Sequence, residues 1–186
     1  MNATRVTATK LVDTLVLEPH VFGDSRGYFF ESWNARAFRD AIGRDVTFVQ
    51  DNESRSQRGV LRGLHYQIEQ AQGKLVRVSR GCVFDVCVDL RRSSPTFGQW
   101  DGLELSEENR RQLWIPAGFA HGYLVLSESA DVLYKTTDFY APAHERTIRW
   151  DDAELRIAWP LDSGQAPLVS AKDAAGMPFS QASFFD

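Results

Sequence analysis

The segment Val83-Phe84-Asp85-Val86-Cys87-Val88-Asp89-Leu90 decides the fold class of this chain, because its side chains alternate between two faces of an extended backbone. The even-numbered residues are all apolar and share one face, whereas Asp85, Cys87 and Asp89 share the other. A period of two predicts a β-strand whose apolar face lies in a hydrophobic core. The face with two carboxylates fits either solvated surface or the polar interior of a barrel, and the pattern slightly favours the surface.

Similar segments on both sides of this one extend the prediction to an all-β fold. Runs rich in β-branched and aromatic residues are predicted to be strands at 15–17, 28–33, 46–50, 75–78, 112–115 and 131–136. Gly, Pro, Asn, Asp and Ser clusters separate them, as expected for turns. The spacing favours an antiparallel sandwich or barrel.

One helix interrupts this pattern. Asn34 is a suitable N-cap for a short helix with apolar residues at Ala35, Phe38 and Ile42, and Gly43 stands where a left-handed stop is expected. From Pro160 onward the chain becomes rich in Gly, Pro, Ser and Asp, which predicts an irregular segment lying on the barrel. We expect residues 1–186 to form a single domain.

The amino-acid composition argues against some classes of binding partner. The 186 residues include 21 basic and 25 acidic side chains, a net charge of −4, without a block of like charges that would suggest nucleic-acid or membrane binding. No run approaches about 18 apolar residues, and residues 1–19 lack a signal-peptide pattern, so we expect a soluble cytoplasmic protein. Cys82 and Cys87 lie roughly 16 Å apart if they share one strand, which predicts free thiols.

Two histidines stand among small residues and turn signals. They are His65 in RGLHYQ (62–67) and His121 in PAGFAHG (116–122). A structural imidazole is the more common role of a lone histidine, and we assign that role to His20 and His144; His65 and His121 are candidate general bases.

The order Pro116, Gly118, His121 resembles the second motif of the cupin superfamily, whose jelly-roll barrel often holds a metal through three histidines and a glutamate. A cupin metal site would need a histidine two residues after His65, where Gln67 stands. Two imidazoles are too few for a tight divalent site. We therefore expect an organic acid/base site with neither metal nor cofactor.

A closer resemblance covers nearly the whole chain. It is similar to the dTDP-4-dehydrorhamnose 3,5-epimerase family in seven stretches in order, GDSRGYF (23–29), QDN (50–52), RGLHYQ (62–67), QGKLV (72–76), PAGFAHG (116–122), YKTTDFY (134–140) and SAKD (170–173). The resemblance implies a cupin-type jelly roll with short peripheral helices, acting as a homodimer. It also implies conversion of dTDP-4-dehydro-6-deoxy-D-glucose to dTDP-4-dehydro-L-rhamnose, in dTDP-rhamnose biosynthesis.

Inversion of a carbon beside a ketone needs a base on one face, an acid on the other and a cation at the enolate oxygen. By resemblance, His65 is the base, Asp173 orients it, Tyr134 returns a proton from the opposite face and Lys74 supplies the cation. Each has an alternative that the residues alone leave open. Tyr134 fits a core position, Lys74 fits a solvated strand entrance, and Asp173 fits the cap of a helical turn.

The same resemblance implies the substrate contacts. Arg26 and Arg62 meet the diphosphate, and Phe29 and Tyr140 form apolar walls. The other implied contacts are Glu31, Gln50, Asn52, His121, Glu145 and Lys172. In the family an N-terminal segment crosses into the partner's sheet, so Arg26 and Glu31 could complete the other chain's site.

Regular pleating places Arg62 and His65 on opposite faces of a strand, because their numbers differ in parity. A shared pocket requires an irregular strand, which Gly63 could provide, or else Arg62 serves the neighbouring subunit.

Three other functions compete with this interpretation. The first is an epimerase that inverts only carbon 3 or only carbon 5, the second is a metal-dependent cupin acting on a small sugar, and the third is a sugar-nucleotide binding module without catalysis.

Overall fold

The structure, a computed structural model, describes residues 4–161 and 164–186. Its strands are β1 (Arg5–Ala8), β2 (Leu15–Glu18), β3 (Phe22–Asp24), β4 (Gly27–Phe29), β5 (Gln50–Gln57), β6 (Leu61–Gln67), β7 (Lys74–Arg80), β8 (Cys82–Asp89), β9 (Trp100–Ser106), β10 (Gln112–Ile115), β11 (Phe119–Val125), β12 (Ser129–Thr136) and β13 (Glu145–Thr147). Its helices are α1 (Ala35–Ile42) and α2 (Ala171–Ala174), with 3-10 turns η1 (Pro142–His144) and η2 (Phe179–Gln181).

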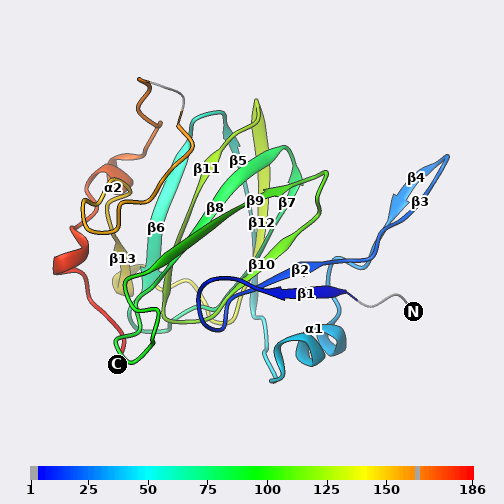
Figure 1. Ribbon diagram of the computed structural model, residues 1–186, viewed down its shortest axis with the longest axis horizontal. Coiled ribbons are helices and arrows are strands. Elements are labelled where there is room, and N and C mark those ends of the chain that lie inside the picture. Colours follow the sequence, from blue (N-terminus) through cyan, green and yellow to red (C-terminus); the bar gives the residue numbers. More distant parts are fainter. Residues whose placement is uncertain (1–3, 162–163) are drawn as a thin grey trace.

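Two antiparallel sheets face each other and form a jelly-roll barrel, which confirms the predicted fold class (Figure 1). The six-stranded sheet has the order β1-β2-β10-β7-β12-β5, and the five-stranded sheet has the order β13-β6-β11-β8-β9. Between them lies an apolar core that includes Val76, Leu113, Val125 and Val132. None of the helices within the described residues is long and apolar enough to cross a membrane.

Strand β8 is buried on both faces, so the expectation that its acidic face lies at the surface was wrong. Asp85, Cys87 and Asp89 point between the two sheets and are at most 1% exposed. The opposite face, with Val86 and Val88, packs under the C-terminal segment in a second apolar cluster. Because that segment covers the outer face of the sheet, the polar face is left for the barrel interior.

The predicted helix is confirmed with its caps. The Asn34 side chain accepts a hydrogen bond from the Ala37 amide, and Gly43 takes a left-handed conformation with φ of 72°. Two predicted strands were wrong in part. β4 ends at Phe29, and residues 46–49 form no strand, because Val46 and Phe48 instead join the cluster of apolar side chains under α1.

The C-terminal segment is irregular and lies on the barrel, as predicted. Parallel bridges join Leu168 to Val60 and Met177 to Ile148, and α2 lies between these two anchor points. By contrast, the β3–β4 hairpin projects away from the barrel (Figure 1), and its Phe22, Tyr28 and Phe29 are between 56% and 68% exposed.

Candidate active site

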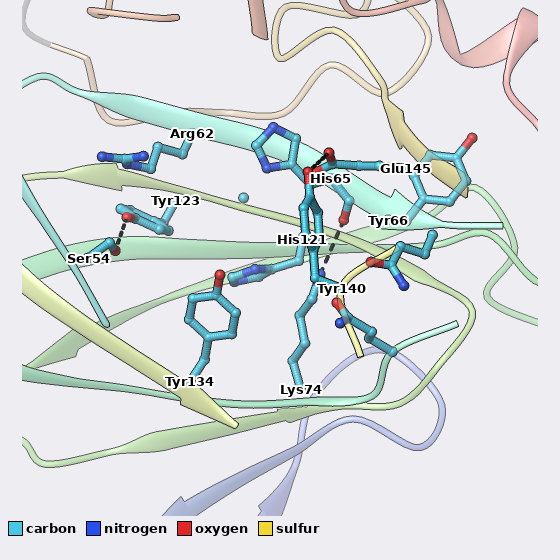
Figure 2. Close-up of a pocket in the computed structure, with 13 residues that line it drawn as sticks. Ser54, Arg62, His65, Tyr66, Lys74, His121, Tyr123, Tyr134, Tyr140 and Glu145 are labelled. Atoms are coloured by element: carbon cyan, nitrogen blue, oxygen red, sulfur yellow. Dashed lines mark hydrogen bonds between the residues drawn. The ribbon is translucent and has the colours of Figure 1, made fainter. Parts of the chain in front are cut away.

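A cavity opens between the two sheets at the end of the barrel where β6, β7, β11 and β12 meet (Figure 2). Of the predicted site residues it is lined by Arg62, His65, Lys74, His121, Tyr134, Tyr140 and Glu145. Polar and aromatic side chains that the sequence interpretation had not selected complete it, namely Ser54, Tyr66, Gln67, Gln72 and Tyr123.

An irregularity in β6 brings Arg62 and His65 to this one cavity. The register of β6 against β11 shifts between His121 and Tyr123, and Gly63 has a φ of 119°. A Cβ at this glycine would lie 2.6 Å from the Cα of Gly122, so only glycine fits. The irregular-strand alternative is therefore confirmed.

His65 is paired with a buried carboxylate. Its Nε2 lies 2.5 Å from Oδ1 of Asp173, which α2 supplies. Ser170 caps this turn by accepting from the Asp173 amide and also donates from its hydroxyl to Oδ2 at 2.7 Å. Burial raises the pKa of Asp173, but hydrogen bonds from His65 and Ser170 outweigh it and lower the pKa to about 2. Asp173 thus lies in a capped helical turn and also contacts His65.

Lys74, at the start of β7, is a buried ammonium beside this pair. It is 8% exposed, and its Nζ donates to the carbonyl oxygen of His65 at 3.4 Å. Burial lowers its pKa to about 8, against the opposing influence of Glu145 and Asp85. At neutral pH the group remains a cation within reach of a cavity ligand.

Tyr134 extends from the opposite sheet, with its hydroxyl directed into the space below His65 and Arg62 (Figure 2). Burial, reinforced by Tyr123 and Glu145, raises the pKa of this phenol. A raised pKa keeps the hydroxyl protonated, so Tyr134 can donate a proton across the cavity from His65.

The rim of the cavity is a hydrogen-bonded chain. The hydroxyl of Tyr140 donates to Glu145 at 2.8 Å, and Lys172 forms an ion pair with the same carboxylate at 2.5 Å. Gln50 accepts from the Tyr140 amide and donates to Asn52 Oδ1 at 2.8 Å. Five of the predicted contacts are therefore linked to one another at the mouth.

The structure does not bring Arg26, Phe29 and Glu31 to this cavity within one chain. Arg26 forms an ion pair with Asp24 in the projecting hairpin, and Glu31 accepts from Asn34 at the start of α1. Phe29 shares a shallow depression with Arg26.

Asp85 is the main residue that sequence reasoning missed. Both of its carboxylate oxygens lie 2.9 to 3.0 Å from Nε2 of His121. The alternation of β8 did place it on a polar face, but the face was assigned to solvent. Tyr123 could have been found from its position two residues after His121, on the same side of β11.

Gln67, at the position where metal-binding cupins carry histidine, supports the neighbouring loop. Its amide donates to the carbonyls of Gln70 and Phe139, and its Oε1 accepts from the Ala141 amide at 2.9 Å. Across the described part of the chain, no three His, Cys, Asp or Glu side chains form a group that could hold a metal ion.

A jelly-roll barrel with this interior defines a cupin-type protein whose site carries a paired imidazole, a buried ammonium and a facing phenol. Comparison with known sequences makes the class specific. The family model described as dTDP-4-dehydrorhamnose 3,5-epimerase matches residues 8–181, and the chain belongs to this family.

Individual relatives agree. A dTDP-4-dehydrorhamnose 3,5-epimerase of Pseudomonas aeruginosa is 65% identical over 185 residues, covering 100% of this chain and 99% of that protein. The crystal structure of the Legionella pneumophila epimerase in complex with dTDP-4-keto-L-rhamnose superposes with a TM-score of 0.93 at 51% identity, covering 97% and 95% of the two chains. ChmJ, a 3'-monoepimerase from Streptomyces bikiniensis solved with dTDP-quinovose, gives 0.86 at 34% identity and 92% and 86% coverage.

Proposed function

We propose that this chain inverts carbons 3 and 5 of dTDP-4-dehydro-6-deoxy-D-glucose by proton abstraction beside the 4-ketone. The observation that carries the mechanism is the position of His65, paired with Asp173, across one cavity from the Tyr134 hydroxyl, with Lys74 at the side. A base on one face, an acid on the other and a cation between them are the groups that inversion through an enolate requires.

His65 acts as the base in this proposal. It removes the proton from the carbon next to the ketone, and the electrons of that C–H bond move to the carbonyl oxygen to form an enolate. The Asp173 carboxylate stabilises the imidazolium that results and fixes the ring orientation.

Lys74 and Tyr134 handle the charge and the returning proton. The buried ammonium of Lys74 stabilises the enolate oxygen more strongly than an exposed one would, because the cavity screens charges poorly. Tyr134 then delivers a proton to the opposite face of the carbon, which inverts it.

Side chains at the rim of the cavity bind the nucleotide in this proposal. Arg62 supplies a guanidinium for the diphosphate, and Tyr140 forms a wall for the base of the nucleotide. His121 and Glu145, which line the cavity, are proposed as sugar or nucleotide contacts. Gln50, Asn52 and Lys172 are proposed in the same role, supported by their hydrogen-bonded connection to Tyr140 and Glu145.

The active form is proposed to be a homodimer in which Arg26, Phe29 and Glu31 complete the partner's site. Their distance from the cavity of their own chain and the exposed aromatic side chains of the β3–β4 hairpin support this arrangement. Residues 1–186 are proposed to act as one epimerase domain in the cytoplasm, where the free thiols of Cys82 and Cys87 would stay reduced.

Heavy-water incorporation tests the reaction. The protein is incubated with dTDP-4-dehydro-6-deoxy-D-glucose in D2O, and deuterium is counted by mass spectrometry. We expect incorporation at two carbons; incorporation at one would identify a mono-epimerase such as ChmJ, and incorporation at none would leave a binding module.

The base is tested by His65→Ala, which should abolish exchange at both carbons. His144→Ala, which removes an imidazole whose 3.6 Å ion pair with Glu69 lies outside the cavity, is the matched control and should exchange normally. If His65→Ala retains turnover within about tenfold of the parent, His65 is not the base.

Shared sites are tested by co-expressing His65→Ala and Arg26→Ala chains. If each site uses Arg26 from the partner, random pairing restores about a quarter of the wild-type activity, since half of the dimers hold one intact site. Activity no higher than that of the separate variants would exclude the exchange.

A further inference from the structure

A second imidazole–carboxylate pair lies inside the barrel beside the first. His121 on β11 is the direct cross-strand partner of His65 on β6, so the two rings project from one face of the sheet. Asp85 on β8 holds Nε2 of His121 with both carboxylate oxygens, at 2.9 and 3.0 Å. The proposed steps use His121 only as a substrate contact and do not use Asp85 at all.

Asp85 receives fewer hydrogen bonds than a buried carboxylate with a purely structural role would need. It is 0% exposed, and within the described residues its hydrogen bonds come from His121 alone. Asp89, four residues along the same strand and equally buried, instead receives bonds from the Arg91 guanidinium and the hydroxyls of Ser94 and Thr96. An ionised carboxylate without solvent is costly unless a cation or a strong donor faces it, and the group that faces Asp85 is the His121 ring.

We propose that Asp85 is a positioning residue that holds His121 as an oriented imidazolium, which donates from Nδ1 to the substrate oxygen that becomes negative. The inference rests on the proposed enolate mechanism and adds a second donor beside Lys74. Because Asp85 occupies Nε2, Nδ1 is the nitrogen left for a ligand of the cavity that His121 lines. Two fixed cationic donors at one developing oxyanion stabilise it more than one.

The charges around the pair are consistent with this assignment. Asp85 and Glu145 both favour the charged form of Lys74, so the carboxylate supports both cations. The other charged or titratable groups that line the cavity are Arg62, His65 and Tyr66 from β6, Tyr123 from β11, Tyr134 from β12, Tyr140 after it and Glu145 from β13. On β8 itself, burial and then Asp85 raise the pKa of the Cys87 thiol, which remains neutral.

The test is Asp85→Asn, which keeps the shape and removes the charge. We expect kcat at pH 8 to fall about 100-fold, with KM within about threefold, because Asp85 does not contact the substrate. Loss of the carboxylate also lets Lys74 release its proton at lower pH, because Asp85 favours the charged form of Lys74. The alkaline limb of kcat should therefore move to lower pH, and the defect should shrink as the solution is acidified.

Two comparisons make the result specific. Asp89→Asn removes an equally buried carboxylate from the same strand and should lower stability without moving the pH profile of kcat. Combined with His121→Asn, Asp85→Asn should add little further loss, because Asp85 acts through His121. The proposal would be overturned if Asp85→Asn kept both the kcat and the alkaline limb of the pH profile of the wild type. It would also be overturned if kcat fell while the alkaline limb did not move.

A wild-type measurement covers the case in which Asp85→Asn does not fold. Nitrogen-15 NMR of the His121 ring at pH 7 should show both nitrogens protonated. An unprotonated Nδ1, as in a neutral ring that donates to Asp85 from Nε2, would overturn the assignment. His65→Ala separates this inference from the mechanism it rests on. An inactive His65→Ala beside a normal Asp85→Asn refutes the role of Asp85 alone, whereas exchange by His65→Ala refutes the mechanism.

Discussion

Replacement of Asp173 by Asn measures what the carboxylate contributes to the base. Against the opposing effect of burial, the pKa of Asp173 is lowered from an ordinary 3.8 to about 2, which corresponds to about 2 kcal/mol of net interaction with its surroundings, His65 foremost among the donors. The same interaction favours the imidazolium that forms when His65 accepts a proton. An amide keeps the shape but loses the charge, so we expect kcat to fall about 30-fold, the factor equivalent to about 2 kcal/mol.

Deuterium incorporation from D2O is the assay, since it reports proton abstraction even when net inversion fails. Ser170→Ala is the matched control, because it removes the cap of α2 and the bond to Oδ2 but leaves the bond to His65. It should cost about 1 kcal/mol of stability and keep kcat within about threefold. Exchange by Asp173→Asn within threefold of wild type would refute the coupling of this carboxylate to the base.

Four further outcomes are expected from the site and the strand that carries it. Tyr134→Phe should keep exchange of the labile hydrogen better than net inversion, as measured by NMR of the product; equal loss of both would mean that Tyr134 is structural. Activity should fall as pH rises through about 8, where the Lys74 ammonium is lost, and a pH profile flat to 9.5 would contradict this role. The folded pKa of Lys74 lies below its ordinary 10.5, so the unfolded chain binds more protons between these values and the group's contribution to stability rises with pH there. Gly63→Ala should lower the free energy of unfolding by about 2 to 3 kcal/mol in urea titrations, because the added Cβ meets backbone atoms at 2.6 and 2.7 Å. Gly23→Ala is the control, since the nearest atom to its added Cβ lies 3.8 Å away.

Local signals in the sequence predicted the fold class because they act over short distances. The caps at Asn34 and Gly43 and the alternation of β8 depend on neighbouring residues alone, and all three appear in the structure. Segment 46–49 has strand-like composition, but its side chains are needed in the cluster under α1, which the sequence does not reveal. The side of β8 that faces the interior likewise depends on which segment covers the sheet.

The sequence predicted which residues form the site better than it predicted how they are arranged. Resemblance selected His65 and Asp173, but the bond between them spans 108 positions and depends on where α2 lies. The sequence did not predict Asp85 as a site residue, because a carboxylate on an alternating strand is usually solvated. The projection of Arg26 away from the cavity depends on how the whole β3–β4 hairpin is oriented relative to the barrel, and neighbouring residues give no sign of that.

The carboxylate paired with the proposed base is carried by one helical turn outside the two sheets, and it meets β6 only through hydrogen bonds from the Gly63 amide and from His65. Backbone bonds at Leu168 and Met177 fasten that turn on either side. Warming that frays it separates Asp173 from the imidazole while the two sheets remain intact. We therefore expect thermal inactivation to begin below the temperature at which tryptophan fluorescence reports melting, and cooling to restore turnover without refolding of the barrel.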